Sequence, residues 1–543
     1  MGSELGKTVD TKPQVRLNGL GIFWLTFGIA WTLILLGGIA FLWIRRNMPI
    51  LRIRGLPLSI GAVLLMHVYW FCVTTGYVYG PVMPEVTEYW IMGLWLPFGV
   101  ALFHASNSRF LYVANAQKKF SKQSTEPYRI YTRRPGRLSL RESIKMWWIQ
   151  LDYSNKTLIV VSVGMAFQAF MTIFIYLISR KFHSDYGIPG TEVTGTPMEI
   201  AVQQGRGWEW WPTCFWQLGW AWIVAPIILF RSRKIADTQG WRFQTIACCI
   251  AGLPAAPMWL IALYVPAMAP VNNYFIPPSW IAVSIMFLEI FTIFVPIYEV
   301  VKQRNLTSET LESIARWESR QRLGATKGVK SLNSDISGTT WNSRNSRATS
   351  IGTSSGGSIL TMDALEHTLD KNPEPLQEFS ALKDFSGENV AFLLRVRDWR
   401  AAHFAVAKKE IGEEEKNTPI IAITRECFEG ALHIYLDFIS ATNAEFQLNL
   451  ASGDFAKLKH TFEEAAQAVC AATVASDPAT PFANETPRLA SEILNYTGEI
   501  PFEFNEHVFD DAELSIKYLV LTNTWPKYIR QRRSFDASSV DTV

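Results

Sequence analysis

Apolar residues along this chain gather in seven long runs that carry no charge, apart from one glutamate in the last run. Each run is long enough for a helix to cross a hydrocarbon core of about 30 Å at about 1.5 Å per residue. Backbone amides in lipid must be satisfied within their own segment, so the pattern predicts seven membrane-spanning α-helices. The runs are Leu20–Ile44, Gly55–Pro84, Tyr89–Ser108, Leu158–Ser179, Trp210–Phe230, Phe243–Val265 and Trp280–Ile297.

Basic residues between the runs predict the orientation in the membrane. The loop after the first run holds four Lys or Arg residues, residues 118–145 after the third run hold nine, and the loop after the fifth run holds four. The connections Pro81–Glu88 and Pro266–Pro278 hold none, and the connection after the fourth run holds three. Basic loops face the cytoplasm, so residues 1–18 are expected outside the cell and the C-terminal half in the cytosol of a multi-pass plasma-membrane protein. The net charge of +3 then reflects topology, and no nucleic-acid partner is expected.

Beyond Tyr298 the chain becomes polar, and its pattern divides it into three parts. Residues 301–360 are rich in Ser, Thr, Gly and Asn, which predicts a flexible linker; within it, Thr307–Arg322 is expected to extend the last span as a helix. Residues 361–532 repeat apolar positions at helical spacing and predict an all-helical domain. Residues 533–543 form a short tail.

The helical spacing is clearest in three stretches of this domain. Phe392–Trp399 carries apolar residues at i, i+1, i+4 and i+7, as a helix packed on a core does. Glu426–Ile439 predicts a second helix and Phe509–Leu521 a third, which we expect Pro526 to end, because proline lacks the N–H that a helix interior needs.

Four blocks of the C-terminal half carry a family resemblance. They are EFSALKDFSGENVAFLLRVRDW (Glu378–Trp399), ALHIYLDFI (Ala431–Ile439), FQLNL (Phe446–Leu450) and FDDAELSIKYLVLTNTWPKYI (Phe509–Ile529). In this order they resemble the domain of the regulators of G-protein signalling (RGS). With the seven runs before them, the whole chain resembles the receptor-like seven-transmembrane RGS proteins of plants and fungi. The resemblance implies an all-α chain, with a seven-transmembrane bundle in residues 19–300 followed by a cytosolic RGS-type bundle.

The resemblance also implies a binding site. The RGS domain binds the switch regions of a GTP-loaded Gα subunit and speeds GTP hydrolysis, without catalytic chemistry of its own. By position in the motifs, the family's contact residues fall on Glu388, Asn389, Asn449, Leu519, Asn523, Thr524 and Lys527. The short amides of Asn389 and Asn449 can both donate and accept hydrogen bonds. By themselves, these two asparagines are also explained as capping or turn residues.

The chain departs from the family pattern in the site and in two loops. Asn523, Thr524 and Lys527 stand where the family has an Asp-Ser pair and a following Arg. Asn lacks the negative charge of Asp, whose carboxylate would accept a hydrogen bond from a backbone amide of a Gα switch, and Lys cannot reproduce the bidentate geometry of Arg. The segments Ala401–Pro419 and Phe455–Phe504 exceed a compact core and are interpreted as insertions, the second one partly helical over residues 457–472.

Glu289 is the one charged residue within the seven runs. A carboxylate near mid-span is costly unless it is paired, protonated or facing a cavity, which indicates an interior polar site with His67 or His104 as its partner. A protonated packing residue and a different span boundary are the alternatives. Since the outer connections are short, a small molecule is the class of ligand expected for this half.

The sequence therefore leads to the hypothesis of a membrane-tethered negative regulator of heterotrimeric G-protein signalling. Its expected partners are a Gα subunit, membrane lipid and a small ligand of the seven-span part. The six cysteines show no metal-ligand spacing, and neither a metal nor a cofactor is expected. Two alternatives stay open, namely a seven-helix transporter with a scaffolding tail, and a receptor whose tail binds Gα without changing GTP turnover.

Overall fold

The computed structural model describes residues 2–121, several positions between 141 and 151, and residues 153–183, 185–325, 360–403, 419–475, 496 and 498–540. The chain divides into two compact units. The seven-span unit comprises residues 1–116 and 138–301, and the C-terminal unit comprises residues 117–137 and 302–543. The regular secondary structure of the described residues is entirely helical, with no strand beyond an isolated bridge between Ser179 and Ile188, which confirms the predicted all-α class.

Seven helices among the described residues are long and apolar enough to cross a membrane, as the hydropathy pattern predicts. In chain order they are α1 (Gly19–Ile44), α3 (Leu56–Tyr79), α4–η1–α5 (Glu85–Trp90, Ile91–Trp95, Leu96–Ala116), α7 (Tyr153–Ile178), α9–η4–α10 (Trp211–Leu218, Gly219–Val224, Ala225–Ser232), α11–α12 (Trp241–Gly252, Ala255–Tyr264) and α14–η6–α15 (Ser279–Glu289, Ile290–Phe294, Val295–Ala325). The short helices between them are α2 (Pro49–Arg52), α8 (Pro197–Gln204), η3 (Trp208–Trp210), η5 (Pro266–Met268) and α13 (Ala269–Asn272).

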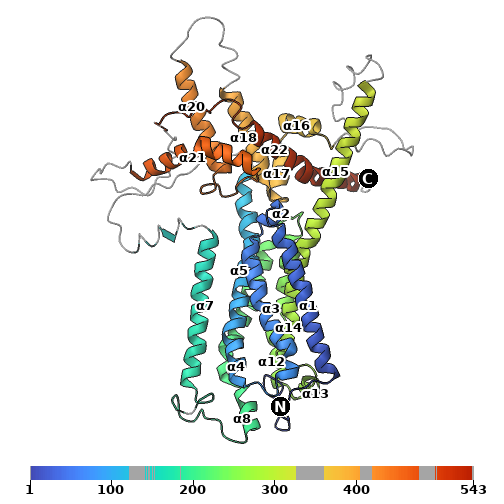
Figure 1. Ribbon diagram of the computed structural model, residues 1–543, viewed down its shortest axis with the longest axis vertical. Helices are drawn as coiled ribbons and strands as arrows, with labels where there is room; N and C mark the ends of the chain where they lie inside the picture. Colours follow the sequence, from blue (N-terminus) through green and yellow to red (C-terminus); the bar gives the residue numbers. More distant parts are fainter. Residues whose placement is uncertain are drawn as a thin grey trace. The chain divides into compact units, whose positions relative to one another are not determined.

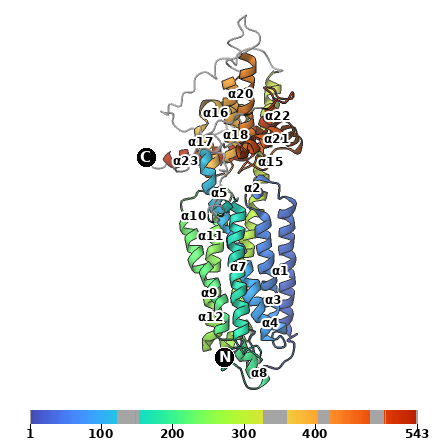
Figure 2. The ribbon, with the colours of Figure 1, turned by 90° about the vertical axis from the view of Figure 1, so that its left-hand side faces the viewer.

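Helix α3 lies at the centre of the seven-span unit, where it packs against α1, α5 and α14 (Figures 1 and 2). Small residues permit the close approach of neighbouring helices. A Cβ atom added to Gly99 of α5 would lie 2.8 Å from Met66 Cγ of α3, and one added to Gly93 of η1 would lie 2.5 Å from Thr172 Cγ2 of α7. Glycine at these two positions therefore allows the backbones to approach more closely than any side chain would permit.

The residues before α1 fold onto the seven-span unit, which hydropathy does not predict. Ser3 Oγ donates to Glu85 Oε1 at 2.7 Å, and Lys7 Nζ lies 3.4 Å from the same carboxylate oxygen. The buried carboxylate of Glu4 accepts a hydrogen bond from Trp259 Nε1 of α12. The N-terminal residues 3–7 are thus part of the folded unit.

The C-terminal unit is a bundle of short helices around α18. Its described elements are η2 (Gln117–Ser121), the part of α15 from Lys302 onward, α16 (Met362–Lys371), α17 (Glu374–Leu382), α18 (Gly387–His403), α20 (Pro419–Ile434), η7 (Tyr435–Ile439), α21 (Ser452–Ala475), α22 (Asp510–Leu519), η8 (Val520–Thr524) and α23 (Trp525–Val540). The short turns η7 and η8 are π-helical and continue α20 and α22 without a break.

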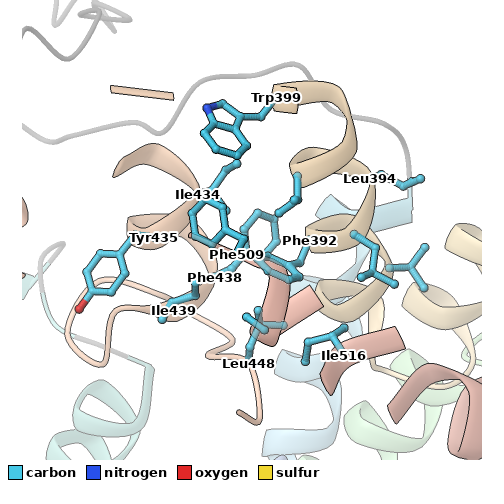
Figure 3. Close-up of a cluster of buried hydrophobic side chains, with 14 of the residues drawn as sticks. Phe392, Leu394, Trp399, Ile434, Tyr435, Phe438, Ile439, Leu448, Phe509 and Ile516 are labelled. Atoms are coloured by element: carbon cyan, nitrogen blue, oxygen red, sulfur yellow. The ribbon is translucent and has the colours of Figure 1, made fainter. Parts of the chain in front are cut away.

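Aromatic side chains fill the core of this unit (Figure 3). Phe392 of α18 lies with its ring centroid 6.0 Å from Phe438 of η7 and 6.1 Å from Phe509, and Phe462 of α21 stacks on Phe509 at 5.7 Å. Phe392, Phe462 and Phe509 are fully buried. Burial of each such side chain stabilises the fold by about 1.5–3 kcal/mol, and the apolar stripe predicted for Phe392–Trp399 faces this core.

Two predictions about helix ends have opposite outcomes. The insertion helix predicted over residues 457–472 is confirmed within α21. The prediction that Pro526 ends its helix is wrong, because α23 runs from Trp525 to Val540. Pro526 is the second residue of α23, within a helix that continues from α22 through η8, and the wider π-helical turn η8 directly before it accommodates the missing N–H.

The helix expected over Thr307–Arg322 is present within α15, which continues unbroken from Val295 to Ala325. The rest of the expected linker, to residue 359, lies outside the described residues. The same holds for residues 404–418 of the first insertion, for residues 476–495 of the second, and for residues 541–543 of the tail.

Candidate functional site

A strained turn carries the beginning of α18, where the resemblance places Glu388 and Asn389. Phe385 has φ of 51° and is buried, and it is the only non-glycine residue with positive φ among those described. A bulky side chain rarely adopts this conformation, and such strain concentrates at functional sites because the surrounding structure must enforce it. The turn is held by the Ser386 amide, which donates to Ser380 O at 2.9 Å.

Asp384 connects this turn to η8 and α23. Its buried carboxylate accepts hydrogen bonds from Ser386 Oγ at 2.9 Å, from Thr524 Oγ1 at 2.9 Å and from Lys527 Nζ at 2.8 Å. Ser386 Oγ and Thr524 Oγ1 are 3.2 Å apart, although 138 positions separate them in the sequence. Two of the predicted contact residues, Thr524 and Lys527, thus lie beside the turn that carries two others.

The predicted contact residues at this junction are largely buried. Glu388 is 9% exposed, Asn389 4%, Asn523 6% and Thr524 1%. The side-chain oxygen Oδ1 of Asn523 has no hydrogen-bond partner within the part of the chain that the structure describes. Buried polar atoms are nearly always paired, so an unpaired one marks a site that a further group can complete. Leu519, the last residue of α22 directly before η8, is partly buried against the core.

Asn449 lies apart from this junction, in the loop between η7 and α21. The Leu448 amide donates to Phe438 O at 2.8 Å, and Gln447 Nε2 donates to Ile439 O at 3.0 Å, so the loop is anchored on both sides of its turn. Leu448 is buried in the core shown in Figure 3, whereas Asn449 is exposed. The buried Leu448 thereby holds the backbone in place beside Asn449, whose side chain is exposed to solvent.

The short helix η2 lies between the junction and the Asn449 loop, and sequence reasoning did not predict it there. Gln117 Oε1 accepts the Gly387 amide at 3.0 Å, and Gln117 Nε2 donates to Glu388 Oε2 at 2.9 Å. The ring of Phe120 lies 6.1 Å from those of both Phe438 and Phe446. No signal in the sequence around Gln117 points to these contacts, because every one of their partners lies at least 270 positions away.

One acid near this site has an altered pKa. Burial raises the pKa of Asp437 in η7 to about 6, and the nearby cations of Arg395 and Lys119 partly oppose this shift. Lys119 of η2 also forms an ion pair with Glu445 at 2.6 Å, with the two side chains 46% and 37% exposed. Exposed pairs of this kind contribute little stability, so the apolar contacts of Phe120 and the bonds of Gln117 hold η2 more firmly.

The seven-span unit contains a second cluster of predicted site residues, around Glu289. The Glu289 side chain is fully buried, and its Oε1 atom is 3.0 Å from His67 Nδ1. Its Oε2 atom accepts Trp31 Nε1 at 2.6 Å, while His67 Nε2 is 2.9 Å from Thr32 Oγ1. The carboxylate therefore has a partner for each oxygen, and three spans meet at it.

His104, the other partner considered for Glu289, belongs to a different environment. Its ring stacks on Trp220 at 5.1 Å, and its Nδ1 atom has no hydrogen-bond partner among the described residues. A separate open groove of about 560 Å³ lies between α7 and the region of η3 and α9, lined mostly by aromatic and aliphatic side chains that include Phe167, Trp211 and Trp216. An apolar small molecule is the chemistry that this groove would admit.

Comparisons of this chain with known protein families, with curated proteins and with solved structures find no match.

Proposed function

We propose that this chain is a membrane-tethered negative regulator of heterotrimeric G-protein signalling, whose C-terminal unit binds the switch regions of GTP-loaded Gα and accelerates GTP hydrolysis. The observation that carries the proposal is the junction of α18 and η8. Thr524 and Lys527, which the family resemblance selects, bond there to Asp384, and Thr524 also contacts Ser386, two positions before the selected Glu388 and 138 positions away from Thr524. The unpaired Oδ1 atom of Asn523 adds an acceptor for a partner's N–H group.

The proposed role requires no nucleophile or general base from this chain. Gα supplies an arginine and a water-orienting glutamine, so a regulator needs only to hold the switches in their reactive arrangement. A hundredfold acceleration corresponds to about 2.7 kcal/mol of differential binding to the transition state. A few hydrogen bonds are sufficient for an effect of this size. Asn449 is exposed and available for one of them, whereas the side chains of Asn389 and Asn523 are buried in this structure and contribute only once they become accessible.

Attachment to the seven-span unit would keep the C-terminal unit near lipid-anchored Gα, where a high effective concentration compensates for modest affinity. This part of the proposal includes a plasma-membrane location with an extracellular N-terminus, and it rests on the distribution of Lys and Arg between the spans. The proposal also includes a small ligand of the seven-span unit, for which the open apolar groove between α7 and α9 is the candidate site.

A second function, Gα binding without acceleration, is favoured by one observation. Lys527 stands where the family has an arginine, and its ammonium group is engaged with the buried carboxylate of Asp384. A cation that is bound within its own domain is less available to a partner, which supports a scaffolding role.

The test is single-turnover GTP hydrolysis by a Gα subunit of the host, with the full chain in lipid nanodiscs and with a fragment of residues 302–543 whose helicity is checked by circular dichroism. Acceleration by the fragment, reduced about tenfold or more by Asn389→Ala combined with Asn449→Ala, is the expected result. Gln467→Ala, an exposed substitution on α21, is the matched control. Binding with unchanged turnover would establish the scaffold instead, and no binding to any host Gα would refute both functions.

A further inference from the structure

The N-terminus of α18 is capped by a side chain from outside the four family blocks. The first N–H groups of a helix have no intrahelical partner and need an acceptor. For Gly387 that acceptor is the amide oxygen of Gln117, at 3.0 Å. The amide nitrogen of the same side chain donates to Glu388 Oε2 at 2.9 Å, and Gln117 itself is fully buried. One glutamine side chain thus binds both the Gly387 N–H donor and the Glu388 carboxylate acceptor at the start of the proposed site.

The residues after Gln117 extend this contact across the site. Phe120 is 9% exposed and packs against Phe438 and Phe446, beside the loop that carries Asn449. An added Cβ at Gly387 would lie 2.8 Å from Phe120 Cβ, so η2 approaches the start of α18 as closely as a glycine allows. The segment therefore spans the distance between the two parts of the proposed Gα-contacting surface.

We infer that Gln117–Ser121 is an internal competitor of Gα, which closes the surface formed by the start of α18 and the Asn449 loop until the segment is released. The inference rests on the proposed function and adds its regulation. The resemblance gives the Glu388 side chain as a Gα contact, and in this structure its carboxylate is bonded to Gln117, so a Gα switch and this segment cannot both be bound to it at once. The burial of Glu388 in this structure is that of the closed state.

The position of the segment in the chain suggests what controls its release. Helix α5 ends at Ala116, and η2 begins at the next residue, within the same candidate membrane span. A change at the end of this span therefore acts on the competitor through the continuous backbone. The segment is bound in the closed state and released in the open state, and Gα favours the open state only as far as it binds that state more tightly. Weakening the contacts of the segment therefore raises the apparent affinity for Gα by the factor by which the open population increases.

The experiment uses the full chain in nanodiscs and compares Gln117→Glu, Phe120→Ala and Ser121→Ala with the unmodified protein. The first variant places a second carboxylate beside Glu388 and removes the amide donor, and the second removes the apolar contact. Ser121→Ala is the control, since its hydroxyl bonds to Lys118 O within the same segment. Opening is read from hydrogen exchange of the peptide containing the Gly387 amide, and function from single-turnover GTP hydrolysis by Gα.

For Gln117→Glu and for Phe120→Ala we expect faster exchange at Gly387 and an increase of about tenfold in GTPase acceleration at subsaturating protein, with the control unchanged. A second readout is carbodiimide coupling of Lys119 to Glu445, whose charged groups are 2.6 Å apart. Gα loaded with a non-hydrolysable GTP analogue should lower the yield of this cross-link, and GDP-loaded Gα should not.

The outcomes separate this inference from the function on which it rests. Faster exchange with equal, non-zero acceleration by variant and unmodified protein would overturn the competition and leave the proposed function standing. Unchanged exchange in both variants would overturn it as well, because the segment would then not depend on these contacts. Faster exchange with no acceleration by any form of the chain would refute the proposed function, and the competition with it.

Discussion

Replacing Lys527 by methionine tests the connection between the turn at Asp384 and α23. The Lys527 ammonium pairs with Asp384 at 2.8 Å, and the two side chains are 14% and 0% exposed. Methionine preserves the length of the apolar stem and removes only the charge. The Asp384 carboxylate would then stay buried with its hydroxyl donors, Ser386 and Thr524, and without this neutralising partner.

The two halves of the pair should not respond equally. Removing one partner of a buried ion pair costs about 3–5 kcal/mol, because the remaining charge is uncompensated. This value applies to Lys527→Met, since Asp384 has no path to solvent. In Asp384→Asn the lysine is already partly exposed and can turn toward water, so about 1–2 kcal/mol is expected. The double variant buries no charge, and we expect it to be about 2 kcal/mol more stable than Lys527→Met alone.

The assay is hydrogen exchange of the α18 amides in the full chain, because these amides report the opening of the C-terminal unit independently of the seven-span unit. A loss of 3–5 kcal/mol corresponds to roughly a hundredfold to a few thousandfold faster exchange when exchange follows the opening equilibrium. Equal effects of Lys527→Met and Asp384→Asn, or a double variant less stable than Lys527→Met, would refute the reasoning.

Three further predictions follow from the same structure. Burial raises the folded pKa of Asp437 to about 6, above the ordinary value of 3.8, so its contribution to stability falls as pH rises from about 4 through 6. Asp437→Asn should therefore raise the free energy of opening of the C-terminal unit by roughly 2–3 kcal/mol at pH 7.5, measured as slower hydrogen exchange, and should have little effect at pH 4. Glu289→Gln retains a hydrogen-bond acceptor for the Trp31 indole and a polar group for His67, so in nanodiscs it should unfold near the unfolding temperature of the unmodified protein. Glu289→Leu should unfold well below that temperature, and equal unfolding temperatures for the two variants would contradict the interior polar role. Gly93→Ala forces a methyl group against Thr172 and should destabilise the seven-span unit by about 1–3 kcal/mol, while Gly61→Ala, which meets open space, should have no such effect in the same thermal assay.

Local sequence patterns were sufficient to predict the helices, but they did not predict where every helix ends. The seven spans follow from apolar runs because a bilayer imposes a length and an absence of charge on each segment separately. The helix of the second insertion follows from its own periodicity. The continuation of α23 past Pro526 does not, because it depends on η8 inserting a wider turn at a position that sequence periodicity does not mark.

The two candidate sites depended on tertiary structure to different degrees. A carboxylate inside an apolar run indicates a polar partner by itself, and the choice of His67 over His104 required the packing of α1, α3 and α14. In the C-terminal unit, the resemblance selected Glu388, Asn389 and Thr524, whereas Asp384 and Gln117 were not selected.

The amino-acid sequence by itself determined the class of this protein, its seven apolar helices and the helical character of its C-terminal half, because each of these depends on residues within a turn or two of one another. Only the tertiary structure decided that Asp384 joins α17 to α23 and that Gln117 caps α18. These contacts connect residues more than a hundred positions apart. A hydrogen bond between such residues leaves no periodic signal, since its geometry depends on the packing of every helix between them.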